Sequence, residues 1–557
     1  MLPRFVIAAL GWAILLALGP GGMHGPEPHP SAFLGVAALA CAVGRPGPRS
    51  FWVEWMVSAL ASAMLLDWIR YVFGPALIFC ALIYGFHGAL FGVLLKRLVL
   101  KSSWALAVPV AWCAMESIRF LVPVPLGMRW LQLGHYAIDQ EVIIGAARVI
   151  GPTGLSYVLA ALSGLLIDSA LRRANSRSFI AGLAPLGLAA VLASQTAIPA
   201  NVPGPRVLLI QPGISQARKQ RPLDPLELHQ RQVELTRSAL ADSAAPTPDV
   251  VCWGETMLGF PLVGDTLAEA VRMGALGEVT LPGISLPPDR LPQAVESWQT
   301  LERRLVSQRL LGSGPGRLLP EGCAFVCGAE VLVLFEGEVR RVNAVCSWSP
   351  TGKRMSVCPK LELVPGGETL YGLEQSQSVR DVVQEVAGYL PNLLAGDETG
   401  VFELPRKDGG VWRATGTVCY DNSFIHPYTE PLTRGEDIDL HLICSNEAWY
   451  LDSWEVDQMI CMSRMIAVST ARPVVRATNS GISAIFDASG QELGRIRENG
   501  VDRQVAGSLA LEVPVQPKTA SVTLYCRIQA YIPWLLLCLA AFIGIGSRGS
   551  GGYQGDF

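Results

Sequence analysis

Three residues with complementary chemistry each stand at the edge of an apolar segment. Cys419 follows the run Thr415-Gly-Thr-Val, Glu255 follows Val250-Val-Cys-Trp-Gly, and Lys360 opens Lys-Leu-Glu-Leu-Val-Pro. A cysteine thiolate is a strong nucleophile that can hold an acyl group as a thioester. At neutral pH the thiol needs a base or a nearby positive charge to ionise. These residue types predict covalent acyl transfer, provided that the fold brings them together.

Each residue has a distinct candidate role. Glu255 is the candidate general base, which takes the thiol proton and returns it to a leaving group. Lys360 is the candidate positive charge, and with the backbone N–H of Tyr420 it would stabilise an oxyanion, a role typically worth roughly 3–4 kcal/mol. Glu368 follows Lys360 by eight residues across a Pro-Gly-Gly turn and is placed to hold the ammonium. Alone, each has a plainer explanation, a core cysteine or a surface charge, so the prediction depends on their joint occurrence.

The composition excludes several classes of protein. The chain has 557 residues, of which half are hydrophobic and 16% are charged, against roughly 25% charged in a soluble protein. A net charge of -3 gives no general attraction to nucleic acid. Thirteen cysteines are too few for a disulfide scaffold of this length. Cys323 and Cys327 lack a second Cys/His pair, so we predict no metal site.

The apolar residues concentrate in membrane-length segments. A bilayer crossing needs about 20 mostly apolar residues, and about eight candidate spans are found, at 4–20, 31–44, 51–69, 73–95, 103–118, 147–170, 179–197 and 531–546. Every second connection is basic, as cytoplasmic loops are; the residues are Arg45, Arg49, Lys96, Arg97, Lys101, Arg172, Arg173 and Arg177. This pattern predicts a cytoplasmic N-terminus, residues 198–530 on the outer side, and Arg548 back in the cytoplasm.

Two charges lie at the outer end of the fifth span. Glu116 and Arg119 stand near Trp112. They predict either an interfacial ion pair with an aromatic anchor or a contact for a lipid headgroup, and the sequence leaves both open.

The rest of the chain alternates strands with helices. Strand-like runs occur at 205–211, 249–253, 324–335, 342–347, 415–420, 439–444 and 482–486, and helical patterns at 225–242, 376–388 and 453–471. Alternating strands and helices predict an α/β layered fold. We therefore expect an N-terminal bundle at 1–197, a catalytic domain at 198–528 with an insertion at about 256–320, and a final span with a tail at 529–557.

These segments resemble one enzyme family. The three chemical segments look like the Glu–Lys–Cys triad of the nitrilase superfamily, whose fold is an α-β-β-α sandwich. Such a domain between seven spans and a final span resembles apolipoprotein N-acyltransferases. The likeness rests on the segments 360–368, 419–421, 445–453, 472–482 and 521–525, which are similar to motifs of that family.

The resemblance implies a complete reaction. Cys419 would take an acyl chain from a phospholipid and pass it to the free amine of a diacylglyceryl-cysteine lipoprotein. It also implies Glu255 as base, Lys360 as oxyanion stabiliser, and Glu368, Tyr420 and Asp421 as supports. A monomer of the bacterial inner membrane is expected, with its catalytic domain on the periplasmic side and without metal or organic cofactor. Two lipid-anchored substrates suit a site facing the bilayer, because the membrane raises their effective concentration.

Accessory residues and departures complete the picture. Trp449 resembles a tryptophan of the substrate-entry region, although packing is as good an explanation. Asn446, Arg472, Arg476 and Asn479 fit structural hydrogen bonding, with substrate contact as the alternative for Asn446. The chain departs from the family pattern at Gln220, Gly254, Gly366 and Asp421. Two other functions stay open: a membrane-anchored nitrilase-like amidase or other acyltransferase, and an inactive relative that binds lipid.

Overall fold

The computed structural model describes residues 2–22, 27–44, 50–215, 225–242, 247–281, 284–312, 316–373, 376–387 and 391–545. Arg45, Arg49, Gln220 and Arg548, which entered the predictions above, lie outside these residues. The chain forms two compact units: a helical unit of 1–197, 453–470 and 522–557, and an α/β unit of 198–452 and 471–521. The domain boundaries expected from the sequence stay a prediction.

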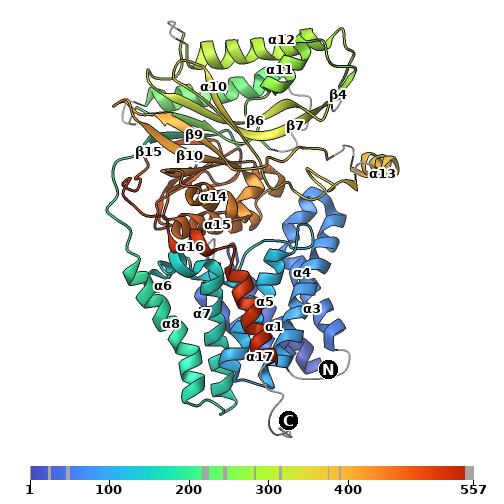
Figure 1. Cartoon of the computed structure of the whole chain (residues 1–557), viewed down its shortest axis with the longest axis vertical. Helices are drawn as coiled ribbons and strands as arrows, with labels where there is room; N and C mark the ends of the chain where they lie inside the picture. Colours follow the sequence, from blue (N-terminus) through green and yellow to red (C-terminus); the bar gives the residue numbers. More distant parts are fainter. Residues whose placement is uncertain are drawn as a thin grey trace. The chain divides into compact units, whose positions relative to one another are not determined.

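The helical unit contains a helix at each predicted apolar segment. These helices are α1 (Leu2–Ala17), α2 (Phe33–Val43), α3 (Ser50–Leu65), α4 (Arg70–Val99), α5 (Trp104–Leu121), α7 (Ala147–Ala170), α8 (Ser176–Gln195) and α17 (Ile532–Ile545) (Figure 1). The same unit includes the short helices α6 (Glu141–Ile144) and α16 (Leu524–Ile528), and helix α15 (Glu455–Thr470).

The predicted membrane character is confirmed in part. In the described residues, four segments are long and apolar enough to cross a membrane: 67–99, 104–121, 147–170 and 176–195. The apolar helices at 6–17, 30–43, 51–65 and 532–545 are shorter. The presence of several apolar helices is therefore confirmed, whereas the number of eight crossings stays a prediction.

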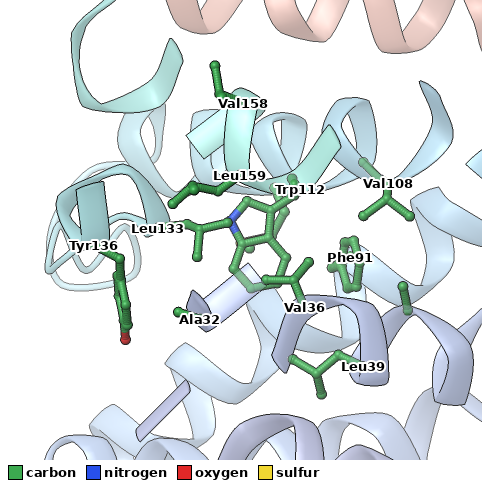
Figure 2. Packing of buried hydrophobic residues seen from close by; sticks show 14 of the residues in the cluster. Ala32, Val36, Leu39, Phe91, Val108, Trp112, Leu133, Tyr136, Val158 and Leu159 are labelled. Atoms are coloured by element: carbon green, nitrogen blue, oxygen red, sulfur yellow. The ribbon is translucent and has the colours of Figure 1, made fainter. Parts of the chain in front are cut away.

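A continuous apolar core holds the helical unit together. Figure 2 shows Trp112 of α5 at its centre, among Phe91 of α4, Val36 of α2 and Leu159 of α7. The Trp112 and Phe91 rings meet edge to face with centroids 5.1 Å apart, an arrangement that aromatic pairs prefer. Met465 and Val468 of α15 belong to the same cluster. This helix, predicted at 453–471, thus packs its apolar side into the helical unit.

In the described residues, the α/β unit contains two large sheets and a separate two-stranded hairpin, and it confirms the predicted α/β fold. The first runs in the order β15 (Gly507–Glu512), β1 (Arg206–Gln211), β2 (Val250–Trp253), β6 (Ala324–Phe335), β7 (Glu338–Trp348) and β8 (Arg354–Pro359), with β3 (Leu262–Val263) beside β6. The second runs β14 (Glu492–Arg495), β13 (Ala484–Phe486), β12 (Val474–Thr478), β11 (Leu440–Ser445), β10 (Val411–Val418) and β9 (Gly400–Pro405).

The two sheets share one buried layer. Val207 of β1 and Val345 of β7 belong to the same apolar cluster as Val418 of β10 and Leu442 of β11, so the sheets pack face to face. The other face of the first sheet has its own cluster, which includes Val233 of α10 (Pro225–Ala241). Helix α14 (His426–Thr433) contacts β10. Helices outside a double sheet give the layered sandwich expected from the sequence.

The predicted insertion at 256–320 is a folded element. It contains β3, α11 (Asp265–Arg272), the hairpin of β4 (Val279–Leu281) and β5 (Ile284–Leu286), α12 (Leu291–Glu302) and the π-helix η4 (Arg303–Leu310). Its small core is formed by Val263, Leu267, Val279, Leu291 and Val295, which pack against Leu332 of β6. Helix α13 (Gln377–Ala387) lies at the predicted position.

Candidate active site

The thiol stands on a sharp turn at the end of a strand. Cys419 directly follows β10 and begins the 3-10 helix η6 (Cys419–Ser423). Its φ of +48° lies in the left-handed region, which costs a non-glycine residue free energy and is found at functional sites. The side chain of Asp421 accepts a hydrogen bond from the backbone N–H of Val418 at 2.9 Å. This bond closes the turn around the thiol.

Asp421 also ties the turn to the segment that carries the lysine. Its other oxygen accepts hydrogen bonds from the backbone N–H groups of Leu361 at 3.2 Å and Glu362 at 2.8 Å. Burial raises the pKa of Asp421 to about 7, against the Lys360 ammonium and the N–H donors, which lower it. The shorter side chain at this position, a departure from the family pattern, therefore still braces the site.

Lys360 is buried and paired with a carboxylate. It follows β8, its side chain is fully buried, and its Nζ lies 2.8 Å from Oε1 and 2.7 Å from Oε2 of Glu368. Glu368 Oε2 also accepts the backbone N–H of Val364 at 2.9 Å. Gly366, in the turn between them, has a φ of +73°, a conformation that glycine adopts without strain. The predicted contact between Glu368 and the ammonium is present.

Glu255 follows β2 and is enclosed by backbone. A Cβ atom at Gly254 would lie 2.7 Å from the carbonyl carbon of Thr478, so the close approach of β12 requires a glycine there. The backbone N–H of Glu255 donates to the carbonyl oxygen of Ser445 at 3.4 Å, across from β2 to the end of β11. The carboxylate Oε1 accepts a hydrogen bond from Asn343 Nδ2 at 2.6 Å.

The three predicted residues act on one another electrostatically. Burial raises the pKa of the Cys419 thiol well above its ordinary value, the Glu255 carboxylate raises it further, and the Lys360 ammonium lowers it. Burial works against the charge of Lys360, yet Glu368, Cys419 and Glu255 together raise the pKa of that ammonium above its usual range. The thiol is therefore neutral and Lys360 is charged in the resting site, so attack by the sulfur requires a base.

The remaining predicted residues lie around this cluster or elsewhere. Tyr420 is half-buried, and its ring meets that of Phe424 with centroids 5.1 Å apart. Asn446 is buried and accepts a hydrogen bond from Asn479 at 2.9 Å, as a structural role predicts. Trp449 is half-buried on the 3-10 helix η7 (Glu447–Tyr450).

Glu116 and Arg119 lie in the helical unit and form no ion pair with each other in the described part of the chain. Glu116 Oε1 accepts hydrogen bonds from Trp112 Nε1 and from the backbone N–H of Leu133, both at 2.9 Å. Arg119 donates to the hydroxyl of Tyr84 and to the Leu131 carbonyl. In the described residues both side chains therefore bond to neutral groups, and the ion pair considered above is not formed.

One residue of the site was missed by the sequence analysis. Asn343 contacts the Glu255 carboxylate and also accepts, at its carbonyl oxygen, the backbone N–H of Lys360 at 2.8 Å. Its signal in the sequence is weak: a single amide within the apolar strand Val342-Asn-Ala-Val-Cys346.

The sheets and the thiol–ammonium–carboxylate cluster define an α/β sandwich with a candidate site for covalent catalysis, in a chain that also contains a unit of apolar helices. Residues 11–165 match the family model described as the apolipoprotein N-acyltransferase N-terminal domain. Several relatives of that name also match the chain, so the family resemblance that the motifs predicted is confirmed.

The relatives share this name at low identity. Apolipoprotein N-acyltransferase of Brucella melitensis is 26% identical over 384 residues, 67% of this chain and 62% of the relative. That of Chlorobaculum tepidum is 22% identical over 505 residues, 88% of this chain and 86% of the relative. The match thus spans less than two thirds of the Brucella protein. A solved amidase of the nitrilase superfamily from Nesterenkonia is 15% identical, covers 57% of this chain and 93% of its own, and has a TM-score of 0.34.

Proposed function

We propose that this protein transfers an acyl chain from a phospholipid, through a thioester on Cys419, to the N-terminal amine of a diacylglyceryl-cysteine lipoprotein. The observation that carries the proposal is the placement of Cys419 on a strained turn under the direct influence of Glu255 and Lys360. The match to the apolipoprotein N-acyltransferase family model and the similarity to relatives of that name support the choice of substrates.

In the first half of the reaction, Glu255 takes the thiol proton as sulfur attacks the acyl ester carbonyl. Lys360 and the backbone N–H of Tyr420 stabilise the oxyanion. Glu368 holds the ammonium in place, and Asp421 keeps the nucleophile turn and the lysine segment together. The carbon–oxygen bond then breaks, and the lysophospholipid leaves with the proton from Glu255.

In the second half, the acceptor amine attacks the thioester. The amine gives its proton to Glu255, and the carbon–sulfur bond breaks with return of that proton to the sulfur. Trp449 and Asn446 are proposed to contact the substrates in the α/β unit, and Glu116 and Arg119 to contact a headgroup in the helical unit. We propose that the protein is a monomer of the bacterial inner membrane, with the α/β unit on the periplasmic side.

The test uses the full chain in detergent with phospholipid and a synthetic diacylated lipopeptide. Mass spectrometry is expected to detect one acyl adduct on Cys419 without acceptor, and a triacylated peptide when acceptor is added. An adduct on another cysteine would contradict the assignment of the nucleophile. Release of free fatty acid without amide formation would instead identify a hydrolase.

A further inference from the structure

Asn343 occupies an unusual position for an amide side chain. On β7, Val342, Ala344 and Cys346 belong to the core on the outer face of the first sheet, whereas Val345 belongs to the layer between the two sheets. Side chains alternate along a strand, so Asn343 shares the inner face with Val345. Cys419 lies in that same layer. A polar group in this apolar layer needs hydrogen-bond partners.

Asn343 bonds Glu255 through its side chain and Lys360 through its backbone. The Nδ2 atom lies 2.6 Å from Glu255 Oε1, and the backbone oxygen of Asn343 accepts the N–H of Lys360. The residue is 6% exposed. One strand position therefore sets where the carboxylate and the lysine segment stand relative to each other.

The chemistry of the amide suits a base that must stay ionised. A hydrogen bond donated to a carboxylate favours its charged form and so lowers its pKa. An amide does not titrate, so it cannot donate a proton to the base. A buried glutamate without such a donor is driven toward its neutral form, in which it cannot accept the thiol proton.

We propose that Asn343 is a positioning residue that holds Glu255 oriented and ionised for both of its proton transfers. The inference rests on the proposed acyl transfer, in which Glu255 receives one proton from the thiol and later one from the acceptor amine. Asn343 is not consumed and exchanges no proton. Its side chain acts through Glu255.

The test measures acylation of Cys419 in a single turnover as a function of pH, with N343L and N343D in the full-length protein. For N343L we expect about a 30-fold lower rate constant and an acid limb moved to higher pH by about one unit, since the carboxylate has lost a donor to its charged form. The aspartate of N343D has the shape of asparagine. When protonated, this aspartate can donate a hydrogen bond to Glu255; when ionised, it repels the Glu255 carboxylate. N343D should therefore approach wild-type acylation at low pH and lose it as the pH rises.

The matched control is S347A. Ser347 lies on the same strand and the same face, is buried, and makes a 2.7 Å hydrogen bond to Ser356 of β8. Its removal should leave the pH profile in place. An N343L variant that is slower with an unmoved acid limb, or N343D without rescue at low pH, would overturn the inference.

A second acyl donor separates this inference from the proposed function. p-Nitrophenyl butyrate acylates a thiol without any lipid, so it reports on Cys419, Glu255 and Asn343 even if phospholipid is not the donor. One outcome is that the wild type reacts with the ester in an Asn343-dependent manner but not with phospholipid. That outcome would refute phospholipid as the acyl donor and would leave the positioning role of Asn343 supported. Equal ester kinetics in wild type and N343L would refute the positioning role alone.

Discussion

Two buried polar clusters, one in each unit, differ in the partners of their charged side chains: the partners are neutral groups in one cluster and charged groups in the other. In the helical unit, Glu116 is bonded to an indole N–H and a backbone N–H, and Arg119 to a hydroxyl and a carbonyl. In the α/β unit, Lys360 faces Glu368 directly, and the charge of Glu255 acts on the thiol.

This difference in partners suggests a role in stability for the cluster in the helical unit and a role in reactivity for the cluster in the α/β unit. Neutral partners satisfy a buried charge without creating a strong local field, and the bonds of Glu116 and Arg119 join α5 to the segment that follows it and to α4. In the α/β unit, the carboxylates and the ammonium group lie close to the thiol and shift its pKa, and shifted pKa values are common at catalytic sites. We therefore expect variants of the first cluster to change stability and variants of the second to change reactivity.

The largest effect is expected from removal of the sulfur. C419A and C419S should lower turnover by about 10⁴-fold or more, as loss of a nucleophile does in other covalent enzymes, while thermal unfolding changes little. Intact-mass spectrometry with phospholipid should detect no adduct. The control is C444A, a fully buried cysteine of β11, in which the adduct on Cys419 should persist. Turnover retained in C419A would show that the nucleophile is elsewhere.

The lysine should affect both rate and stability. K360M removes the proposed oxyanion donor, so we expect acylation about 10²- to 10³-fold slower. It also leaves Glu368 without its counter-ion, and breaking a buried pair costs about 3–5 kcal/mol. The double variant K360M/E368Q should recover part of the unfolding free energy that K360M loses, but none of the acylation rate. Recovery of both would mean that the pair is structural only.

The pH dependence of thiol alkylation should expose the influence of Glu255. Alkylation needs the thiolate, whose fraction grows tenfold per pH unit below the pKa. Because burial and Glu255 raise the pKa of Cys419, labelling by iodoacetamide should be slow at pH 7 and still increase above pH 9. E255Q removes one raising cause, so the pKa falls and labelling at pH 8 becomes several-fold faster, although turnover is lost. Slower labelling in E255Q would contradict the effect of Glu255 on the thiol pKa and would indicate that Glu255 assists alkylation as a base.

The smallest effect is expected in the helical unit. W112F removes the indole N–H bound to Glu116 and keeps an aromatic ring beside Phe91, so we expect a loss of about 1–2 kcal/mol. The melting temperature should fall while acylation per folded molecule is unchanged. W534F, at a position 57% exposed on α17, should change neither. A specific loss of phospholipid acylation in W112F would favour a headgroup contact at Glu116 and Arg119.

The strands and helices of the α/β unit were largely readable from the chain. Apolar runs predicted β1, β2, β6 and β11 within a residue or two of their observed bounds, because buried strands require continuous apolar side chains. The strands that were not predicted are β3, β4, β5, β8, β9, β12, β14 and β15. Short or partly polar strands owe their structure to pairing with neighbours, which a local pattern does not contain.

The sequence by itself was sufficient to predict which residues would carry the chemistry. A thiol, an ammonium group and a carboxylate at strand ends, within recognisable motifs, were sufficient to predict covalent acyl transfer and an apolar helical unit. Only the tertiary structure placed Asn343 against Glu255, gave Asp421 its three backbone donors, and gave Glu116 and Arg119 neutral partners in place of each other. The physical reason is that residue type sets what a group can do, whereas distance and burial set its partner and its proton affinity. Both depend on residues far away along the chain.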